Sequence, residues 1–313
     1  MKLPTIKSAI IAGGLALCAS SAYAGDALTV VSWGGAYTKS QIEAYHKPYT
    51  AKYGTKIQSE DYNGGLAEIR AQVEAGKITW DVVDLEVSDA ARGCDDGLFE
   101  KISAGSLPNG VNGALPSKDF IPGALQECAV GTIVWSTIYA YDADKYKSKK
   151  PTTISDFFDV KKFPGKRGMR KVPKVNLEWA LMADGVDGKD VYKVLATKAG
   201  QDRAFKKLDT IKNDVLWWEA GAQPPQMLAD GEVVMTSAYN GRIFNAAVTE
   251  KKNFEIVWDR QLFSFDLYAI IKGTPRLKEA LRYVQFSTAS EQLANQARWI
   301  SYGPTRKSSI KLI

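Results

Sequence analysis

Short apolar runs alternate with amphipathic stretches along most of the chain. The runs at 28–33 and 80–85 have the length and the Val and Leu content of buried strands. Between them, Leu66, Ile69 and Val73 follow the spacing of one helix face, and Gly76 provides a stop. We also expect a helix over about 37–53 and a strand over 55–60. This alternation predicts an α/β fold with parallel strands.

The same alternation continues to the end of the sequence. Strands are predicted at 130–140, 233–237 and 267–271. The remaining apolar periodicity predicts helices, which we place at 153–158, 177–182, 202–211, 226–230, 275–285 and 291–297. We find no internal repeat, low-complexity segment or Pro/Ser-rich linker. If the chain forms two domains, crossing strands and not a tether must therefore join them.

Length and composition limit the chemistry that the chain can perform. With 313 residues it exceeds what one hydrophobic core usually supports, which favours two domains of roughly 130–150 residues each. It contains a single histidine, His46, so a Ser-His-Asp, Cys-His or multi-His zinc site would have to use that one imidazole. Neither a P-loop nor G-x-G-x-x-G, H-E-x-x-H or G-x-S-x-G occurs. We therefore predict no catalytic residue, no cofactor and no metal.

The N-terminus has the features of a secretory signal peptide. A basic start precedes an apolar run at 9–17, and Ala22-Tyr23-Ala24 supplies a cleavage site, so we assign 1–24 to the leader. The run is too short to span a bilayer, which needs about 20 residues. A lipoprotein anchored at Cys18 is an alternative, although Leu17 stands where such sites want a small residue. We expect a soluble periplasmic protein.

Removal of the leader also changes the charge. The formal charge of +6 loses two lysines and becomes +4 in the mature protein, which gives no indication of nucleic-acid binding. A basic cluster at 161–171 is interpreted as a solvated face.

Two cysteines remain after the leader. In an exported protein, Cys94 and Cys128 are predicted to form a disulfide. Two buried free thiols are the alternative. The absence of a C-x-x-C motif argues against a zinc or a redox site.

Ligands of α/β sheets bind where strands end and helices begin. Two segments, 33–37 and 86–89, occupy such places and are expected to be loops. Gly34 and Gly35 could bind an anion through their backbone N–H groups, or could simply form a tight turn. Composition alone leaves both interpretations open.

Several short motifs follow one another from about Leu28 to the C-terminus. They are Trp33-Gly34-Gly35-Ala36-Tyr37, Trp80-Asp81-Val82-Val83, Gly97-Leu98-Phe99, Gly131-Thr132, Tyr141-Asp142, Ala229-Asp230-Gly231-Glu232, Tyr239-Asn240-Gly241 and Phe265-Asp266. In this order they resemble the periplasmic spermidine/putrescine-binding proteins of ABC importers, a group within the extracellular solute-binding proteins.

The resemblance implies a type II periplasmic-binding-protein fold, in which two α/β lobes are joined by crossing strands and enclose a ligand cleft. Lobe 1 would comprise 25–134 and 262–313, and lobe 2 would comprise 135–261. It also implies a monomeric receptor that delivers a small amine or zwitterionic ligand to an ABC importer permease in the inner membrane.

The resemblance further implies a set of ligand-binding residues. Trp33 and Tyr239 would be aromatic walls, and Asp266 would hold an ammonium group. Asn176 and Glu178 are weaker candidates, because the similarity is loose there. The complete set is Trp33, Gly34, Gly35, Tyr37, Glu86, Ser88, Trp135, Ser136, Tyr239, Arg242 and Asp266.

Two positions depart from the polyamine-binding pattern. Polyamine binders surround their ligand with acids, because a desolvated ammonium needs a paired charge. Here Gly35 and Arg242 replace two of those acids. An arginine in the cleft would repel a second ammonium and bind a carboxylate through two hydrogen bonds. Together with Asp266 it predicts an ω-amino acid ligand such as γ-aminobutyrate (GABA).

Three alternatives stay open at this point. The protein could be a polyamine receptor of the same fold, with Arg242 pointing to solvent or bridging to an acid. It could also be a secreted hydrolase that works through carboxylates, although no spacing of acids singles out a pair. A purely structural or adhesive protein is disfavoured by the lack of repeats.

Overall fold

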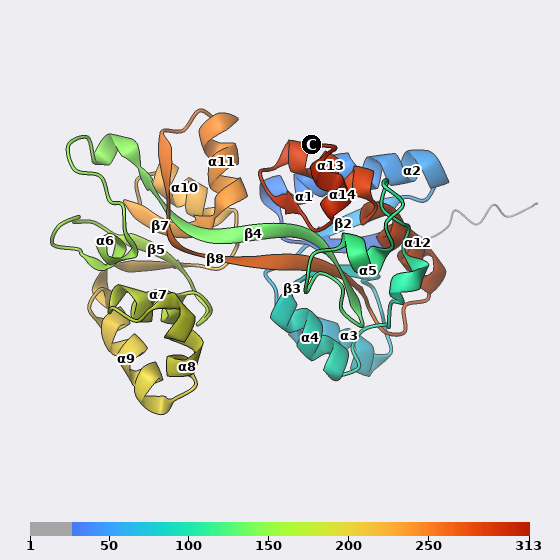
Figure 1. Ribbon diagram of the computed structural model, residues 1–313, viewed down its shortest axis with the longest axis horizontal. Coiled ribbons are helices and arrows are strands. Elements are labelled where there is room, and N and C mark those ends of the chain that lie inside the picture. Colours follow the sequence, from blue (N-terminus) through green and yellow to red (C-terminus); the bar gives the residue numbers. More distant parts are fainter. Residues whose placement is uncertain (1–26) are drawn as a thin grey trace, which may run out of the picture.

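The computed structural model describes residues 27–313, so the expected signal peptide at 1–24 lies outside the described residues. The strands are β1 (Leu28–Ser32), β2 (Ile57–Asp61), β3 (Val82–Glu86), β4 (Ala129–Asp142), β5 (Arg167–Arg170), β6 (Val215–Trp218), β7 (Met235–Tyr239), β8 (Phe254–Ile270) and β9 (Gly303–Pro304). They form one continuous sheet in the order β2-β1-β3-β8-β4-β7-β5-β6, and β9 pairs with β4. This sheet runs through both halves of the molecule (Figure 1).

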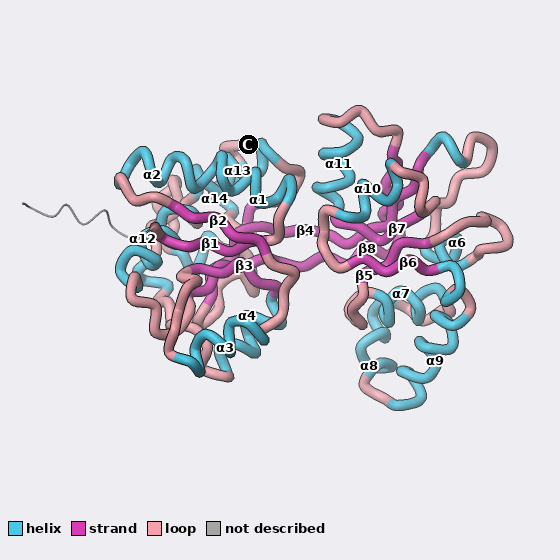
Figure 2. The backbone as a smooth tube through the Cα atoms, turned by 180° about the vertical axis from the view of Figure 1, so that it is seen from behind, coloured by secondary structure: helices cyan, strands magenta, loops and turns pink. Residues whose placement is uncertain are grey.

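Two long strands cross between the lobes. β4 and β8 are antiparallel and pair from Ala129 with Ala269 to Asp142 with Phe254. On one side β2, β1 and β3 are parallel to one another, and on the other side β7, β5 and β6 are parallel. Figure 2 shows the two strands bridging the halves. The fold is therefore the predicted α/β fold of two lobes joined by crossing strands. The limits 134/135 and 262 fall inside β4 and β8 and stay a prediction.

Helices cover both faces of the sheet in each lobe (Figure 1). Lobe 1 has α1 (Gly35–Gln41), a π-helical segment (Ile42–His46), α2 (Lys47–Tyr53), α3 (Ala67–Ala75), α4 (Val87–Asp95), α5 (Pro116–Asp119), α12 (Leu277–Ser287), α13 (Ser290–Trp299) and α14 (Lys307–Ile310). Lobe 2 has α6 (Ile154–Phe158), α7 (Asn176–Ala183), α8 (Val191–Leu195), α9 (Lys198–Asp209), α10 (Gln223–Ala229) and α11 (Asn240–Val248). Short 3-10 turns lie at Ala104–Ser106, Ala143–Lys145, Gly188–Asp190 and Lys212–Asp214.

Alternating burial along the central strands explains this layering. In β3, Val82 packs into one hydrophobic cluster of lobe 1, whereas Val83 and Leu85 pack into a second cluster. All five β3 residues are buried, as expected for a central strand that helices cover on both faces. The apolar runs of the sequence thus mark strands that need helices on both sides.

Local signals place several helix ends where the sequence predicts them. The Thr153 side chain and Asp156 form a capping box at the start of α6, and Gly76 ends α3 with a left-handed conformation. Other elements differ from the prediction. The segments 33–37 and 86–89, expected to be loops, are largely helical: residues 35–37 begin α1, and residues 87–89 begin α4 directly after Glu86 ends β3. β8 begins at Phe254 and is much longer than 267–271, because an exposed stretch at 258–261 separates the apolar residues at its start from those at its end.

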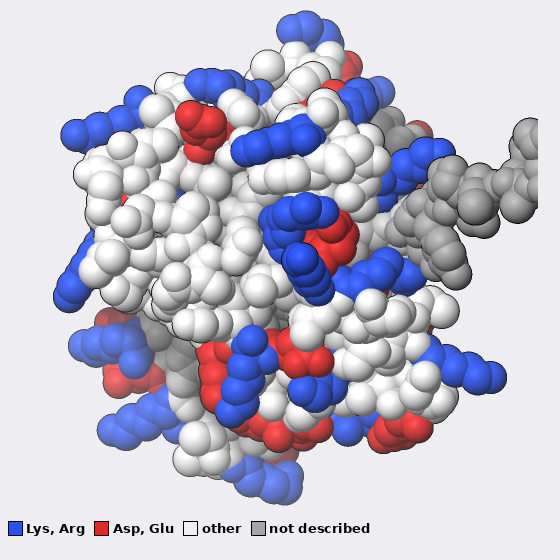
Figure 3. All heavy atoms as spheres, turned by 90° about the vertical axis from the view of Figure 1, so that its right-hand side faces the viewer, with Lys and Arg blue, Asp and Glu red and all other residues white. Residues whose placement is uncertain are grey.

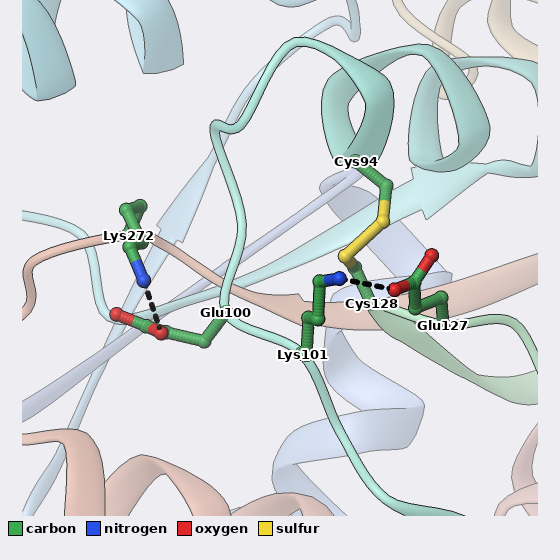
Figure 4. The surroundings of a disulfide bond; sticks show 6 residues. All are labelled: Cys94, Glu100, Lys101, Glu127, Cys128 and Lys272. Atoms are coloured by element: carbon green, nitrogen blue, oxygen red, sulfur yellow. Dashed lines mark hydrogen bonds and ion pairs between the residues drawn. A yellow bond between two sulfur atoms is a disulfide. The ribbon is translucent and has the colours of Figure 1, made fainter.

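The predicted disulfide is present. Cys94, near the end of α4, is bonded to Cys128, which precedes β4, and their Cα atoms are 5.7 Å apart. Figure 4 shows the bond with the Lys101–Glu127 ion pair beside it. The disulfide therefore ties a helix of lobe 1 to the start of a crossing strand.

The basic cluster at 161–171 is not simply a solvated face, so that interpretation is wrong for two of its residues. Arg167 is fully buried, and its guanidinium donates to the backbone carbonyls of Phe157, Phe163 and Gly165. Arg170 points into the space between the lobes. Elsewhere the charges are mixed: on the lobe 1 end of the molecule, Lys and Arg are interspersed with Asp and Glu (Figure 3). Among the helices of residues 27–313, none is long and apolar enough to cross a membrane.

Candidate functional site

Two cavities lie between the lobes. The smaller one has a volume of about 30 Å³, and aromatic side chains including Trp33, Tyr37 and Tyr239 form much of its wall. The larger one has a volume of about 290 Å³. Four side chains line both cavities and stand between them: Glu86, Trp135, Arg170 and Tyr239. The crossing strands thus place the two cavities side by side.

The register of β3 and β8 brings three acids together: Glu86 and Asp266 line the smaller cavity, whereas Asp84 is fully buried beside it. Glu86 pairs with Asp266 across the two strands, and Asp84 lies two residues before Glu86 on the same face. Asp266 Oδ1 accepts a hydrogen bond from Trp135 Nε1 at 2.7 Å. Asp84 Oδ2 accepts from the Tyr37 hydroxyl at 2.9 Å. The site therefore concentrates negative charge at the junction of β3, β4 and β8.

Burial disfavours the ionised form of two of these acids, Asp84 and Asp266, unless a cation lies nearby. Desolvation, followed by the negative charges of Asp84 and Glu86, raises the pKa of Asp266 well above its usual range. Desolvation also raises the pKa of Asp84 to about 7. A positively charged group bound next to Asp266 would oppose both effects, so the acids favour a cationic ligand group.

Glu86 is already paired with cations, and these come from lobe 2. Its carboxylate accepts hydrogen bonds from Arg170 Nη1 and from Lys174 Nζ, each at 2.6 Å. Desolvation alone would raise the pKa of Glu86, but Arg170 and Lys174 outweigh it and lower that pKa. Lys174 Nζ also donates to Ser88 Oγ at 2.8 Å. This group of residues therefore links the two lobes through ion pairs.

Arg242 is a second cation of lobe 2 that faces the smaller cavity, in addition to Arg170. It lies on α11 and is only 4% exposed. Its Nη1 donates to the Gly34 carbonyl and its Nη2 to the Trp33 carbonyl, both at 3.0 Å. These bonds go to lobe 1, so Arg242 neither points to solvent nor reaches across to an acid. It stands in the same cavity wall as Asp266.

Gly35 leaves room for Arg242. A Cβ atom at Gly35 would lie 3.0 Å from Arg242 Nη1 and 3.2 Å from the Ala222 Cβ atom, and its φ of +59° disfavours other residues. A Cβ atom at Gly221 would lie 3.0 Å from Arg242 Nε. The two departures from the polyamine-binding pattern, at positions 35 and 242, are therefore spatial neighbours.

The Gly34-Gly35 segment forms a tight turn and does not present its first N–H to a ligand. Both glycines have positive φ. The Gly34 N–H donates to Thr38 Oγ1 at 2.8 Å, and that hydroxyl donates to Asp61 at 2.7 Å. A carboxylate so close to the turn disfavours an anion there. The turn interpretation is the one that fits.

Most of the expected ligand-binding residues lie at the cavities. Gly34 and Gly35 form the turn beneath Arg242, and Ser88 lines the larger cavity, as do the weaker candidates Asn176 and Glu178. Ser136 lines neither cavity; its N–H donates to the Asn240 side chain at 2.9 Å. Those that line the smaller cavity are Trp33, Tyr37, Glu86, Trp135, Tyr239, Arg242 and Asp266.

Sequence reasoning missed several residues of the site. Asp84 had a detectable signal, because it interrupts an apolar run that predicts a buried strand, whereas Arg170 had none inside the basic cluster. Tyr62 and Tyr302 line the smaller cavity, and nothing in the sequence marked them as site residues. His46 lies in the lobe 1 core, where burial lowers its pKa to about 4. Within 27–313, no three His, Cys, Asp or Glu side chains could together hold a metal ion.

Comparison with known proteins agrees with this geometry. Residues 44–312 match the bacterial extracellular solute-binding protein family. The chain belongs to this family. It is 44% identical over 300 residues to a γ-aminobutyric acid-binding protein of Pseudomonas aeruginosa, covering 96% of this chain and 83% of that relative.

Solved structures of the family also superpose well. The periplasmic binding protein MotA of A. tumefaciens B6, in complex with glucopine, has a TM-score of 0.84 and 30% identity, covering 91% of this chain and 86% of MotA. A GABA receptor has a TM-score of 0.77 and 32% identity, covering 92% of this chain and 85% of that structure. The family resemblance drawn from the motif order is confirmed.

Proposed function

We propose that the protein is the periplasmic substrate-binding component of an ABC importer and that it captures an ω-amino acid, with GABA as the best candidate. The observation that carries this proposal is that a buried acid, Asp266, and a buried arginine, Arg242, both stand in the wall of one small cavity. The names of the 44% identical relative and of the similar GABA receptor support the same ligand.

Each part of GABA has a counterpart in the cavity. The ammonium group would lie beside Asp266, where it offsets the desolvation of the acids. The methylene groups would pack against Trp33 and Tyr239. The carboxylate would accept hydrogen bonds from Arg242, whose guanidinium has donors beyond the two bonded to lobe 1. A cavity of about 30 Å³ suits a short ligand.

Capture would work by lobe closure. Asp266 belongs to the lobe 1 side of β8 and Arg242 belongs to α11 of lobe 2, so a ligand held by both favours the closed arrangement. The permease of the importer would then recognise the closed form. This mechanism needs no covalent step, cofactor or second subunit, and we propose a monomer exported by the leader at 1–24.

The alternative ligand is a polyamine. It has less support, because a second ammonium would meet Arg170 and Arg242 in the smaller cavity, or Arg170 and Lys174 in the larger one. The secreted hydrolase is not proposed, since each acid of the cluster already has a structural or ligand-binding role.

A thermal-shift screen followed by calorimetry tests the proposal. We expect GABA to raise the melting temperature and putrescine and spermidine to leave it unchanged. Asp266→Ala and Arg242→Ala should each abolish measurable GABA binding, and Arg242→Lys should restore only part of it because a lysine cannot bind a carboxylate bidentately. Arg203→Ala, at an exposed arginine of α9, is the control and should bind normally. Stabilisation by the polyamines alone, or wild-type affinity in both alanine variants, would overturn the assignment.

A further inference from the structure

The larger cavity of about 290 Å³ is not used by the proposed GABA site. It lies beyond the partition formed by Glu86, Trp135, Arg170 and Tyr239, and it is open to both lobes, since Ala91 of α4 contributes from lobe 1 and α7 contributes from lobe 2. Its volume greatly exceeds the 10–15 Å³ or so that holds a single water. A space of this size beside a ligand site can receive part of a larger ligand.

The charges around the larger cavity balance. Arg170 and Lys174 are positive, whereas Glu86 and Glu178 are negative. Both Arg170 and Lys174 are already bonded to Glu86. A bound ammonium would lie near two cations and a bound carboxylate near two acids, so neither is favoured. The cavity is therefore suited to an uncharged group.

Hydrogen-bonding groups and aromatic faces are both present in the wall. Ser88, Thr137, Tyr192 and Ser264 supply hydroxyl groups, and Asn176 supplies an amide. Such a mixture of hydroxyl partners and apolar faces fits a chain that carries hydroxyl groups on a carbon backbone.

Two buried polar atoms in this wall lack partners. Trp218 and Ser237 line the cavity and are each 1% exposed. Within the described part of the chain, neither Trp218 Nε1 nor Ser237 Oγ has a hydrogen-bond partner. Leaving such a buried group without a hydrogen bond is unfavourable. A ligand with hydroxyl groups could satisfy both.

The partition shows which end of the ligand would extend. Trp135 donates to Asp266, and Glu86 pairs with Asp266 across the strands, so the partition adjoins the ammonium end of the first site. Arg242, at the carboxylate end, does not line the larger cavity. A substituent on the nitrogen, and not on the carboxylate, would therefore point into it.

We propose that the larger cavity is a second subsite, which receives a neutral, polyhydroxylated substituent carried on the amine nitrogen of an ω-amino acid. This inference rests on the proposed function for the position of the charged head. The nitrogen remains a secondary ammonium beside Asp266, and no bond is made or broken.

Calorimetry with three ligands tests the subsite: GABA, its N-glucityl derivative and its N-hexyl derivative. We expect the N-glucityl compound to bind at least as tightly as GABA and about tenfold more tightly than the N-hexyl compound, as one or two net hydrogen bonds of about 1 kcal/mol each would give. Ala91→Trp places an indole in the larger cavity and should weaken the N-glucityl compound about tenfold while leaving GABA unchanged. Ala75→Trp, at an exposed alanine of α3 away from the cleft, should change neither.

The outcomes separate the two proposals. If the N-glucityl compound binds and GABA does not, the subsite stands and GABA is the wrong ligand. If GABA binds but the N-glucityl compound is more than about tenfold weaker, or the N-hexyl compound is its equal, the subsite is refuted. If none of the three binds, both proposals fail. Should Ala91→Trp not fold, saturation-transfer NMR on the wild type decides: polyol protons must receive saturation, and their silence refutes the subsite.

Discussion

Replacing Glu86 by Gln tests whether ion pairs between the lobes keep the cleft closed without ligand. Glu86 lies in lobe 1 and is bonded to Arg170 and Lys174 of lobe 2, each at 2.6 Å. The Glu86 and Arg170 side chains are 10% and 15% exposed, whereas that of Lys174 is 46% exposed. Water therefore screens the Lys174 pair well and the Arg170 pair poorly.

The magnitude follows from this difference in burial. Removing one partner of a buried ion pair costs about 3–5 kcal/mol, and an exposed pair adds no more than about 1 kcal/mol. Glutamine keeps an oxygen that can accept from Arg170, so we expect a value near the low end. A loss of about 3 kcal/mol would lower the closed-to-open ratio roughly 100-fold.

Small-angle X-ray scattering of the ligand-free protein measures this effect. Glu86→Gln should increase the radius of gyration. Added sodium chloride should increase the radius of gyration of the wild type more than that of the variant, because it screens the ion pairs that the variant lacks. Because Glu86 also lines the ligand cavity, affinity alone would be ambiguous, and the ligand-free measurement removes that ambiguity. Glu68→Gln, at an exposed glutamate of α3, is the control. The same radius of gyration in variant and wild type would refute the role of these ion pairs in closure.

Three further predictions concern stability. Burial raises the pKa of Asp84 to about 7 from 3.8, so the folded protein retains a proton that the unfolded chain releases, and the free energy of unfolding should fall as pH rises between those values. Asp84→Asn should reduce that slope in urea titrations at several pH values, and an unchanged slope would contradict the assignment. Replacing Cys94 and Cys128 by Ser should lower the free energy of unfolding by about 2–5 kcal/mol, and a reductant should lower the melting temperature of the wild type only. Arg306 and Asp119 form a buried ion pair at 3.1 Å, so Arg306→Ala should cost about 3–5 kcal/mol in urea unfolding. A cost below about 1 kcal/mol would show that the pair is effectively solvated.

The sequence predicted elements whose signals are local. Val82, Val83 and Leu85 lie in one apolar run, and the run alone predicts a strand covered on both faces. The capping box at Thr153 and the stop at Gly76 likewise depend on neighbouring residues. The first half of β8 was missed because the exposed residues at 258–261 interrupt it, so the apolar residues on either side do not form one continuous run. Its strand conformation depends on backbone pairing with β4, which is distant in the sequence.

The candidate site was predicted only in part, because a sequence does not show which side chains face the cleft. Motif order pointed to Trp33, Tyr239 and Asp266, which all line the smaller cavity. Arg170 was assigned to the surface, because a basic cluster in a sequence does not show which of its members turns inward. The resemblance placed both Trp135 and Ser136 at the crossing into lobe 2, but successive strand residues face opposite sides of a sheet, and only Trp135 lines the cavities.

By itself, the sequence determined the fold class, the cysteine pairing and the presence of two unusual residues at positions 35 and 242. Only the tertiary structure showed that Gly35 makes room for Arg242, that Asp84, Glu86 and Asp266 gather at one junction, and that Glu86 is bonded across the cleft. The difference comes from the sequence separation over which each interaction acts. Hydrophobic periodicity and turn chemistry act over a few residues, whereas strand register and lobe closure join positions as far apart as Gly34 and Arg242, whose contact exists only after the crossing strands have formed.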